Sequence, residues 1–254
     1  MLFPFALITN NSFKTETEYY ANGPYSLFKS LNLDTLKKVW NLMDYSIKLR
    51  NSIVISMSVA LLAIVISLST AFALGIGKVK GKSFFIMFFL LAFVLPQEVL
   101  VFPLYHLSKL VGLYNTRLSV IIIISVLYSS FGTYFLSSIF SAFSRELIEA
   151  AEIDGCNKLQ LLFRIIVPLS MPSLSILFVF FFIWSWNEFF IPLVFLVSND
   201  NQTITIAMAM AQGQHGATLT LQSAAALLGV IPCIIFFVLF QRTLTKGITL
   251  GSIK

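Results

Sequence analysis

EAAEIDGCNKLQLLFRIIVPLSMP (Glu149–Pro172) is the only sizeable charged segment in the second half of the chain, and a long apolar run lies on each side of it. Uncharged runs of about 20 residues are typical of helices that span a membrane. Two short helices around a glycine, placed between two such spans, predict a polar segment outside the bilayer that can contact another protein. Glu149–Pro172 is therefore the first candidate for a functional segment.

The composition agrees with a membrane protein. Of the 254 residues, 57% are hydrophobic and only 11% are charged, which is too little charge to cover the surface of a soluble domain of this length. The first twenty-odd residues do not form a secretory signal, because no Lys or Arg precedes the apolar residues. The net charge of +6 could indicate nucleic-acid binding. Since the basic residues lie in loops between spans, orientation of the chain in a membrane is the favoured interpretation.

Five segments are long and apolar enough to cross a hydrocarbon core of about 30 Å. They are Ser52–Ile76, Ser83–Leu107, Leu118–Phe140, Ser173–Val197 and Ala224–Phe240, the last of which we expect to begin near Leu219. Met1–Ile8 is apolar but too short to cross, so it is expected to be the remainder of a further span or an interfacial segment. The fold class predicted is all-α: a polytopic membrane helix bundle with five full spans plus a truncated first span. Asp34–Tyr45 is expected to form a short amphipathic helix on the membrane surface.

The distribution of Lys and Arg predicts the orientation. Basic residues gather in Gly77–Lys82, in the charged segment and in the C-terminal tail, which we therefore expect to be cytoplasmic. The loop Ser198–Leu221 has no Lys or Arg and is expected to lie outside. Parity then places Asn10–Arg50 outside as well, although this segment is rich in Lys and Arg.

Local rules predict a helix–turn–helix in the charged segment. Ser144 can cap a first helix, and Asp154-Gly155 can end it, because glycine readily adopts the left-handed conformation. A second helix is expected over about Asn157–Ile166, with Leu159, Leu162, Phe163 and Ile166 on one stripe and Pro168 and Pro172 after its end. The segment is then either an ordinary cytoplasmic loop resting on the bilayer or a helix presented to a groove on a partner protein.

Several motifs resemble those of a known family. Glu149-Ala150-Ala151, then Gly155, then Ile165-x-Val167-Pro168 resemble the EAA loop of ABC importer permeases. Three further stretches resemble the carbohydrate-uptake branch of that family, which includes permeases for maltose and for glycerol phosphate: LPQEVLVFPLYHLSKLVGLYNT (Leu95–Thr116), SWNEF (Ser185–Phe189) and QRTLTKGITLGSIK (Gln241–Lys254). The resemblance covers nearly the whole chain. Val167, where the family prefers Leu, and Cys156, where Ala is common, are mild departures.

The resemblance implies a single type-1 transmembrane domain over residues 1–254, with an EAA loop at about 144–172. It implies that the loop docks in a cleft of an ATPase subunit, with Glu149, Ala150, Ala151, Asp154, Gly155, Ile165 and Pro168 as the coupling residues. It also implies that the tail, through Lys246, Gly247 and Lys254, reaches the ATPase subunits. The partners it implies are a second permease subunit, two ATPase subunits and an extracytoplasmic solute-binding protein, with this chain in the plasma membrane and its EAA loop and C-terminus cytoplasmic.

The chain itself is expected to hold no cofactor and no metal. Gly77–Ser83 resembles a phosphate-binding loop, but three residues separate its two glycines where four are required. ATP and magnesium are therefore expected on a partner ATPase, and the chain is expected not to be an enzyme. Cys156 and Cys233 lie in different environments and show no disulfide or metal spacing.

Glu188 is a charged group inside an apolar run. A charge in a span costs several kcal/mol unless it faces water or a partner. The segment from Trp184 to Glu188 can line a substrate path, with Trp184 or Trp186 stacked on a sugar and Asn187 and Glu188 bonded to its hydroxyls. Alternatively, these side chains only pack the helix against its neighbours. Glu98 is expected in the outer part of a span that Pro96 and Pro103 bend. It either belongs to a kinked span that moves or, as the favoured alternative, is an acid that snorkels to the outer interface.

The predicted function is a permease subunit of an ATP-driven importer for sugars or sugar-like solutes, of the oligosaccharide or glycerol phosphate class. The alternative is a secondary transporter driven by an ion gradient. Such a transporter would need buried ionisable residues along several spans, and only Glu98 and Glu188 are candidates.

Overall fold

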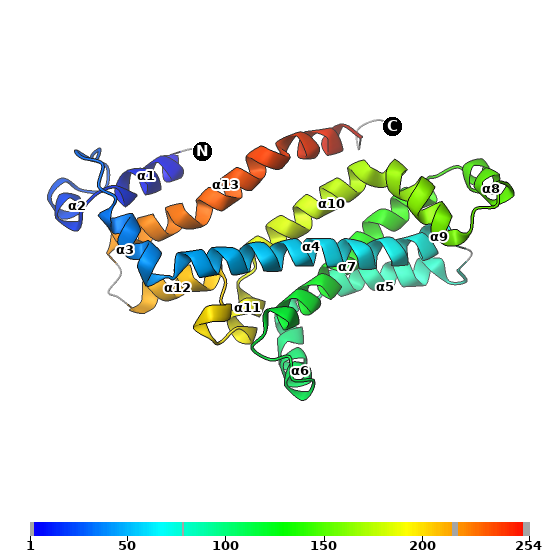
Figure 1. The fold of residues 1–254 in the computed structure, drawn as a ribbon, viewed down its shortest axis with the longest axis horizontal. Coiled ribbons are helices and arrows are strands. Elements are labelled where there is room, and N and C mark those ends of the chain that lie inside the picture. The colour runs from blue at the N-terminus through cyan, green and yellow to red at the C-terminus, as the bar shows by residue number, and fades with distance from the viewer. Residues whose placement is uncertain (1–2, 78, 215–217, 251–254) are drawn as a thin grey trace. The chain divides into compact units, whose positions relative to one another are not determined.

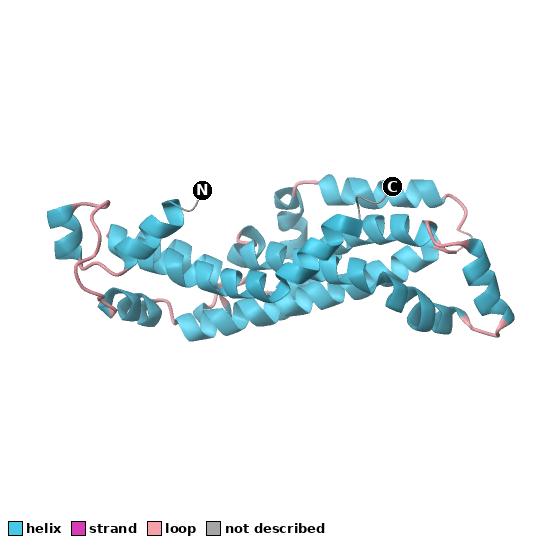
Figure 2. Cartoon of the chain, turned by 90° about the horizontal axis from the view of Figure 1, so that it is seen from above, coloured by secondary structure: helices cyan, strands magenta, loops and turns pink. Residues whose placement is uncertain are grey.

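The computed structural model describes residues 3–77, 79–214 and 218–250, and it describes no side chains for residues 211–214 and 242–250. Within these ranges every regular element is a helix (Figures 1 and 2). The first half contains α1 (Phe3–Ser12), α2 (Glu16–Asn22), α3 (Asp34–Leu42), α4 (Tyr45–Gly75), α5 (Lys82–Val94), α6 (Gln97–Leu110) and α7 (Arg117–Ser141). The second half contains α8 (Arg145–Ile153), α9 (Lys158–Leu161), the π-helical segment η1 (Leu162–Ile166), α10 (Val167–Asn187), α11 (Phe190–Phe195), the 3-10 turn η2 (Asn199–Asn201), α12 (Ile204–Gln214) and α13 (Leu219–Leu250).

Four helices of the described chain are long and apolar enough to cross a membrane: Tyr45–Gly75, Arg117–Ser141, Lys158–Asn187 and Leu219–Gln241. The pair α5 and α6 would make a fifth span if the two helices cross together. An all-helical fold with several membrane-spanning helices is thus confirmed, and the start of the last span at Leu219 agrees with the sequence. The prediction of five full spans is confirmed only to the extent of four to five.

The second expected span, Ser83–Leu107, is not one helix. It consists of α5 and α6, whose axes are bent by 92° (Figure 1). The break lies at Pro96. Leu95, which precedes this proline, has an extended conformation with ψ 132°, because a residue before proline avoids the helical region. Pro103 lies inside α6 without ending it.

The limits predicted for the fourth span, Ser173–Val197, are also wrong. One helix runs from Lys158 to Asn187 without a break, so Pro168 and Pro172 do not end the second helix of the charged segment. The π-helical segment η1 ends at Ile166, two residues before Pro168, and it loosens the backbone at the point where the proline ring would otherwise clash with an α-helical carbonyl. The loop expected over residues 198–221 also contains a helix, α12.

The chain forms two compact units. One contains residues 1–54, 115–117 and 186–239, and the other contains residues 55–114, 118–185 and 240–254. In the second unit α4 and α7 approach closely, because Gly132 faces Ser67: a Cβ at Gly132 would lie 2.2 Å from Ser67 Oγ. Ser67 Oγ donates to the carbonyls of Ala63 (2.6 Å) and Ser129 (3.2 Å), so small residues here permit close helix packing.

In the first unit, polar side chains at the start of α4 hold the segment after α11. The buried Lys48 ammonium donates to the main-chain and side-chain carbonyls of Asn199. Asn51 donates to the carbonyl of Asp200 at 2.7 Å and accepts from Arg117 at 3.0 Å. These bonds satisfy the buried Lys48 and Asn51, and they fix where the segment leaves α11.

Candidate functional site

The charged segment forms a short hairpin between α7 and α10 (Figure 1). Ser144 Oγ accepts from the Leu147 amide at 3.3 Å and caps α8, as the sequence predicts. At the other end of α8, the Gly155 amide donates to Glu152 O and the Cys156 amide donates to Ala151 O, both at 3.0 Å. These two bonds are those of a Schellman motif, which requires the left-handed conformation that Gly155 adopts with φ +78°.

The second helix of the hairpin has a cap of its own. Asn157 Oδ1 accepts from the Gln160 amide, and Gln160 Oε1 accepts from the Asn157 amide, both at 2.9 Å. This reciprocal pair is a capping box. Because the end of α8 and the start of α9 are both capped across only a few residues, local hydrogen bonds fix the angle between the two helices in addition to packing.

The hairpin has a buried side and an exposed side. Ala151, Leu161, Leu162 and Ile166 are buried. Ile153, Leu159 and Phe163, which we call the hairpin patch, are 85%, 68% and 60% exposed. The single stripe predicted for Leu159, Leu162, Phe163 and Ile166 is therefore divided, because Leu162 and Ile166 pack inward while Leu159 and Phe163 point outward. Large apolar side chains exposed together are typical of a protein or membrane contact.

The predicted coupling residues fall on this hairpin and on the helix that follows it. Glu149, Ala150, Asp154 and Gly155 are exposed, whereas Ala151 is buried. Ile165 is half-buried in η1, and Pro168 is exposed in the first turn of α10. Lys246 and Gly247 lie where side chains are not described, and Lys254 lies outside the described residues.

Trp184 lies among aromatic side chains of its own unit. Five rings have centroids 5.2 to 5.9 Å from its own, those of Phe93, Tyr128, Phe131, Phe180 and Phe181. The rings of Phe93 and Phe180 are stacked on it, with interplanar angles of 27° and 9°. Packing against these rings is sufficient to explain a tryptophan at position 184. The contact of Trp184 with a substrate path stays a prediction.

The SWNEF motif, which directly follows Trp184, lies at a helix break. Trp186 is buried and Asn187 is the last, exposed residue of α10. Glu188 Oε1 accepts from the amides of Phe190 (3.0 Å) and Ile191 (3.2 Å), and the Glu188 carbonyl accepts from Thr205 Oγ1 at 3.1 Å. The carboxylate thus binds two amides at the N-terminus of α11, where a negative charge is favourable.

Sequence reasoning missed η1 and the part of the aromatic cluster that surrounds Trp184. No local signal distinguishes a π-helical turn from an α-helical one, but the alternation of aromatic residues Phe178 to Phe182 with Trp184 could have indicated a cluster. In the described residues no group of three or more His, Cys, Asp or Glu side chains could hold a metal ion.

Known proteins are similar to this chain in sequence and in fold. Residues 49–250 match the family described as binding-protein-dependent transport system inner membrane component. The arabinooligosaccharides transport system permease protein of Halalkalibacterium halodurans is 31% identical over 256 residues, which cover 100% of this chain and 91% of that protein. The diacetylchitobiose uptake system permease protein of Streptomyces coelicolor is 28% identical and covered over 92% of its length.

A solved structure has the same architecture. A chain of a bacterial ABC transporter involved in the import of the acidic polysaccharide alginate superposes with a TM-score of 0.79 at 19% identity, over 95% of this chain and 90% of that chain. At this identity the likeness concerns the fold, and the family follows from the sequence match over residues 49–250. The chain therefore belongs to the inner-membrane components of binding-protein-dependent transport systems and is a multi-pass permease subunit of an ABC importer.

Proposed function

We propose that this subunit imports a sugar or sugar-like solute, with ATP hydrolysed by a separate subunit that docks on the α8–α9 hairpin. The observation that carries the coupling role is the hairpin patch: Ile153, Leu159 and Phe163 are exposed on helical segments that flank a turn capped on both sides. A rigid apolar projection between two membrane-spanning helices suits a groove on a partner protein. Glu149, Ala150, Asp154 and Gly155 lie on the same hairpin and would complete the contact.

Force can pass from this hairpin into the membrane because α9, η1 and α10 form one helix. A partner that moves α9 therefore moves α10, whereas α8 is joined to α7 by the three residues 142–144. The helix ends at Asn187, beside the capped break at Glu188. We place Trp184, Trp186, Asn187 and Glu188 near the substrate path on this basis, with Asn187 and Glu188 as the groups able to bond a sugar hydroxyl.

The remaining parts of the proposal follow from the family. A second permease subunit completes the path, a pair of ATPase subunits binds ATP and magnesium, and an extracytoplasmic solute-binding protein delivers the substrate. The hairpin and the C-terminal tail, with Lys246, Gly247 and Lys254, would face the cytoplasm. The carbohydrate class is supported by the relatives, one a permease for arabinooligosaccharides and another for diacetylchitobiose.

The test is uptake by the assembled complex in proteoliposomes. Labelled arabinooligosaccharide, diacetylchitobiose and a free amino acid would be offered with the binding protein, with and without ATP. We expect ATP-dependent uptake of at least one carbohydrate and none of the amino acid. Uptake that follows an ion gradient and ignores ATP would overturn the proposal, because it would identify a secondary transporter.

The coupling contact has a separate test. In a Cys156→Ser background, Ile153→Cys should form a disulfide with a cysteine placed in the docking cleft of the ATPase subunit. A cysteine at Tyr20, which is 73% exposed on α2, is the matched control and should not react. A reaction at Tyr20 with none at Ile153 would exclude the hairpin as the docking element.

A further inference from the structure

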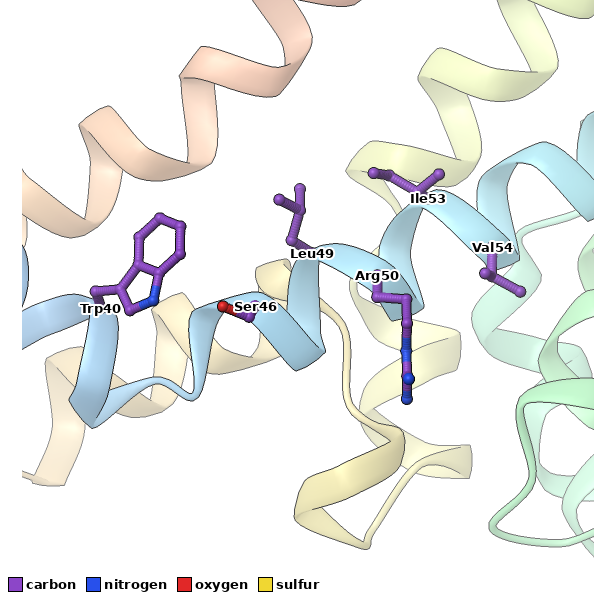
Figure 3. Close-up of a pocket in the computed structure, with 6 residues that line it drawn as sticks. All are labelled: Trp40, Ser46, Leu49, Arg50, Ile53 and Val54. Atoms are coloured by element: carbon purple, nitrogen blue, oxygen red, sulfur yellow. The ribbon is translucent and has the colours of Figure 1, made fainter.

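An open groove lies beside the first turns of α4 (Figure 3). Its volume is about 440 Å³, and it is lined by Trp40, Ser46, Leu49, Arg50, Ile53 and Val54. Trp40 comes from α3 and the other residues from α4. In Figure 3, Leu49 and Ile53 point to one side of α4 and Arg50 points to the other. The groove is therefore an apolar surface with one cation at its edge.

The tryptophan wall of the groove is held in place. The Trp40 ring lies 4.4 Å from the Tyr45 ring, and the Tyr45 hydroxyl donates to the Leu228 carbonyl at 2.8 Å. Val39 in α3 and Met43 directly after it are both buried and anchor this helix. Trp40 itself stays 41% exposed, so its ring is available to a ligand without rearrangement of α3.

Arg50 differs from the other cations near it. Lys48 is bound by Asn199, and Arg117 is bound by Asn51. Within the part of the chain that the structure describes, the exposed Arg50 guanidinium has no hydrogen-bond or ion-pair partner. It therefore keeps five N–H donors and a full positive charge for an external group.

The position of the groove along α4 indicates where that group comes from. α4 has 31 residues, or about 46 Å of helix, against a hydrocarbon core of about 30 Å. Its charge-free sequence begins directly after Arg50. Arg50 and Trp40 thus lie where the helix enters the bilayer, at the level of phosphate groups and interfacial aromatic residues.

We propose that this groove binds one phospholipid with a net negative headgroup. The Arg50 guanidinium pairs with the phosphate, whose oxygens match its planar donors. One acyl chain follows Leu49, Ile53 and Val54 into the bilayer, and Trp40 covers the glycerol region. A zwitterionic lipid fits less well, because its own ammonium group compensates the phosphate.

The experiment measures lipids retained by the complete transporter complex. The complex is extracted from membranes containing phosphatidylglycerol, washed in detergent and analysed by native mass spectrometry. We expect wild type to retain phosphatidylglycerol, Arg50→Gln to retain about tenfold less, and Arg50→Lys to retain an intermediate amount. Lys29→Gln removes a positive charge from another exposed residue of the same unit and should retain the wild-type amount.

A photoreactive benzophenone side chain at Ile53 identifies the occupant directly. The expected adduct has the mass of a phospholipid, whereas an adduct with the second permease subunit would overturn the proposal. Equal retention of phosphatidylglycerol by wild type and Arg50→Gln would also overturn it. Sugar-stimulated ATPase activity is measured on the same samples, so a wrong lipid assignment is distinguishable from a wrong transport function.

Discussion

Gly155→Val changes the backbone preference of the hairpin without creating a steric clash. A Cβ built on Gly155 meets no atom within 4 Å, but its φ of +78° is one that side chains rarely adopt. The left-handed conformation costs a residue with a side chain about 1 to 2 kcal/mol, and a β-branched residue is disfavoured most. Relaxation of the turn would instead break the two Schellman bonds, each of which contributes about 1 kcal/mol.

Both routes thus cost about 2 kcal/mol, which corresponds to a roughly 30-fold smaller preference for the native hairpin. The helices that span the membrane should keep their packing, because a Cβ at Gly155 would meet no atom within 4 Å. If the hairpin couples ATP hydrolysis to transport, the variant should insert and assemble normally while transport per ATP falls about tenfold or more.

The assay is ATP-dependent uptake and ATPase activity of the reconstituted complex, expressed as solute transported per ATP. Gly155→Asn is the conservative variant, because asparagine tolerates the left-handed conformation, and it should remain near wild type. Gly23→Val is the matched control: Gly23 has the same φ of +78° and equally open space around it, but it lies far from the hairpin in sequence. Normal coupling in Gly155→Val would refute the reasoning, and equal losses in Gly155→Val and Gly155→Asn would show that side-chain bulk matters and backbone conformation does not.

Three further outcomes are expected. Gly132→Ala should destabilise the complex by about 1 to 3 kcal/mol through overpacking and so lower its thermal midpoint, since the new Cβ would lie 2.8 Å from Ser67 Cβ; a midpoint equal to wild type would contradict the close packing. Glu188→Ala should destabilise the complex by about 1 to 3 kcal/mol, because two α11 amides lose their acceptor, whereas Glu188→Gln should largely preserve the midpoint by retaining one oxygen. Asn157→Ala should cost about 1 kcal/mol and speed proteolysis of the hairpin, and Asn157→Ser should restore the cap; Gln160→Ala tests the reciprocal bond, and unchanged proteolysis in both alanine variants would exclude the capping box as a stabilising element.

The hairpin could be predicted from sequence because its determinants are local. A cap at Ser144, a left-handed glycine at position 155 and a new helix start near Asn157 each depend on hydrogen bonds within a few residues. The chain closes these bonds itself, so residue identity and spacing are sufficient. The division of the apolar stripe was not predictable, since a helical wheel places Leu159 and Leu162 on neighbouring positions and only the rest of the unit decides that Leu162 is buried.

The limits of the span after the hairpin could not be predicted, because they depend on packing. Pro168 is a helix breaker only where the preceding turn is α-helical, and the preceding turn here is π-helical. The sequence also offers no means to decide whether a carboxylate in an apolar run binds a solute or the backbone. At Glu188 one oxygen binds two amides, so the charge that suggested a substrate contact is explained first by the helix break.

The break at Glu188 and the hairpin are nevertheless connected, because they lie at opposite ends of one helix. Lys158–Asn187 has 30 residues, or about 45 Å, and neither proline within it interrupts the helix. We therefore expect a displacement of α9 to be passed along the helix axis and not to be absorbed by a hinge at Pro168 or Pro172. The first place where the backbone can absorb it is residues 188–189, between α10 and α11. A glutamate that caps α11 across this break keeps α11 fixed to its own unit through Thr205, so movement that begins at the hairpin would be concentrated at Asn187 and Glu188, the two polar residues for which a substrate contact is proposed.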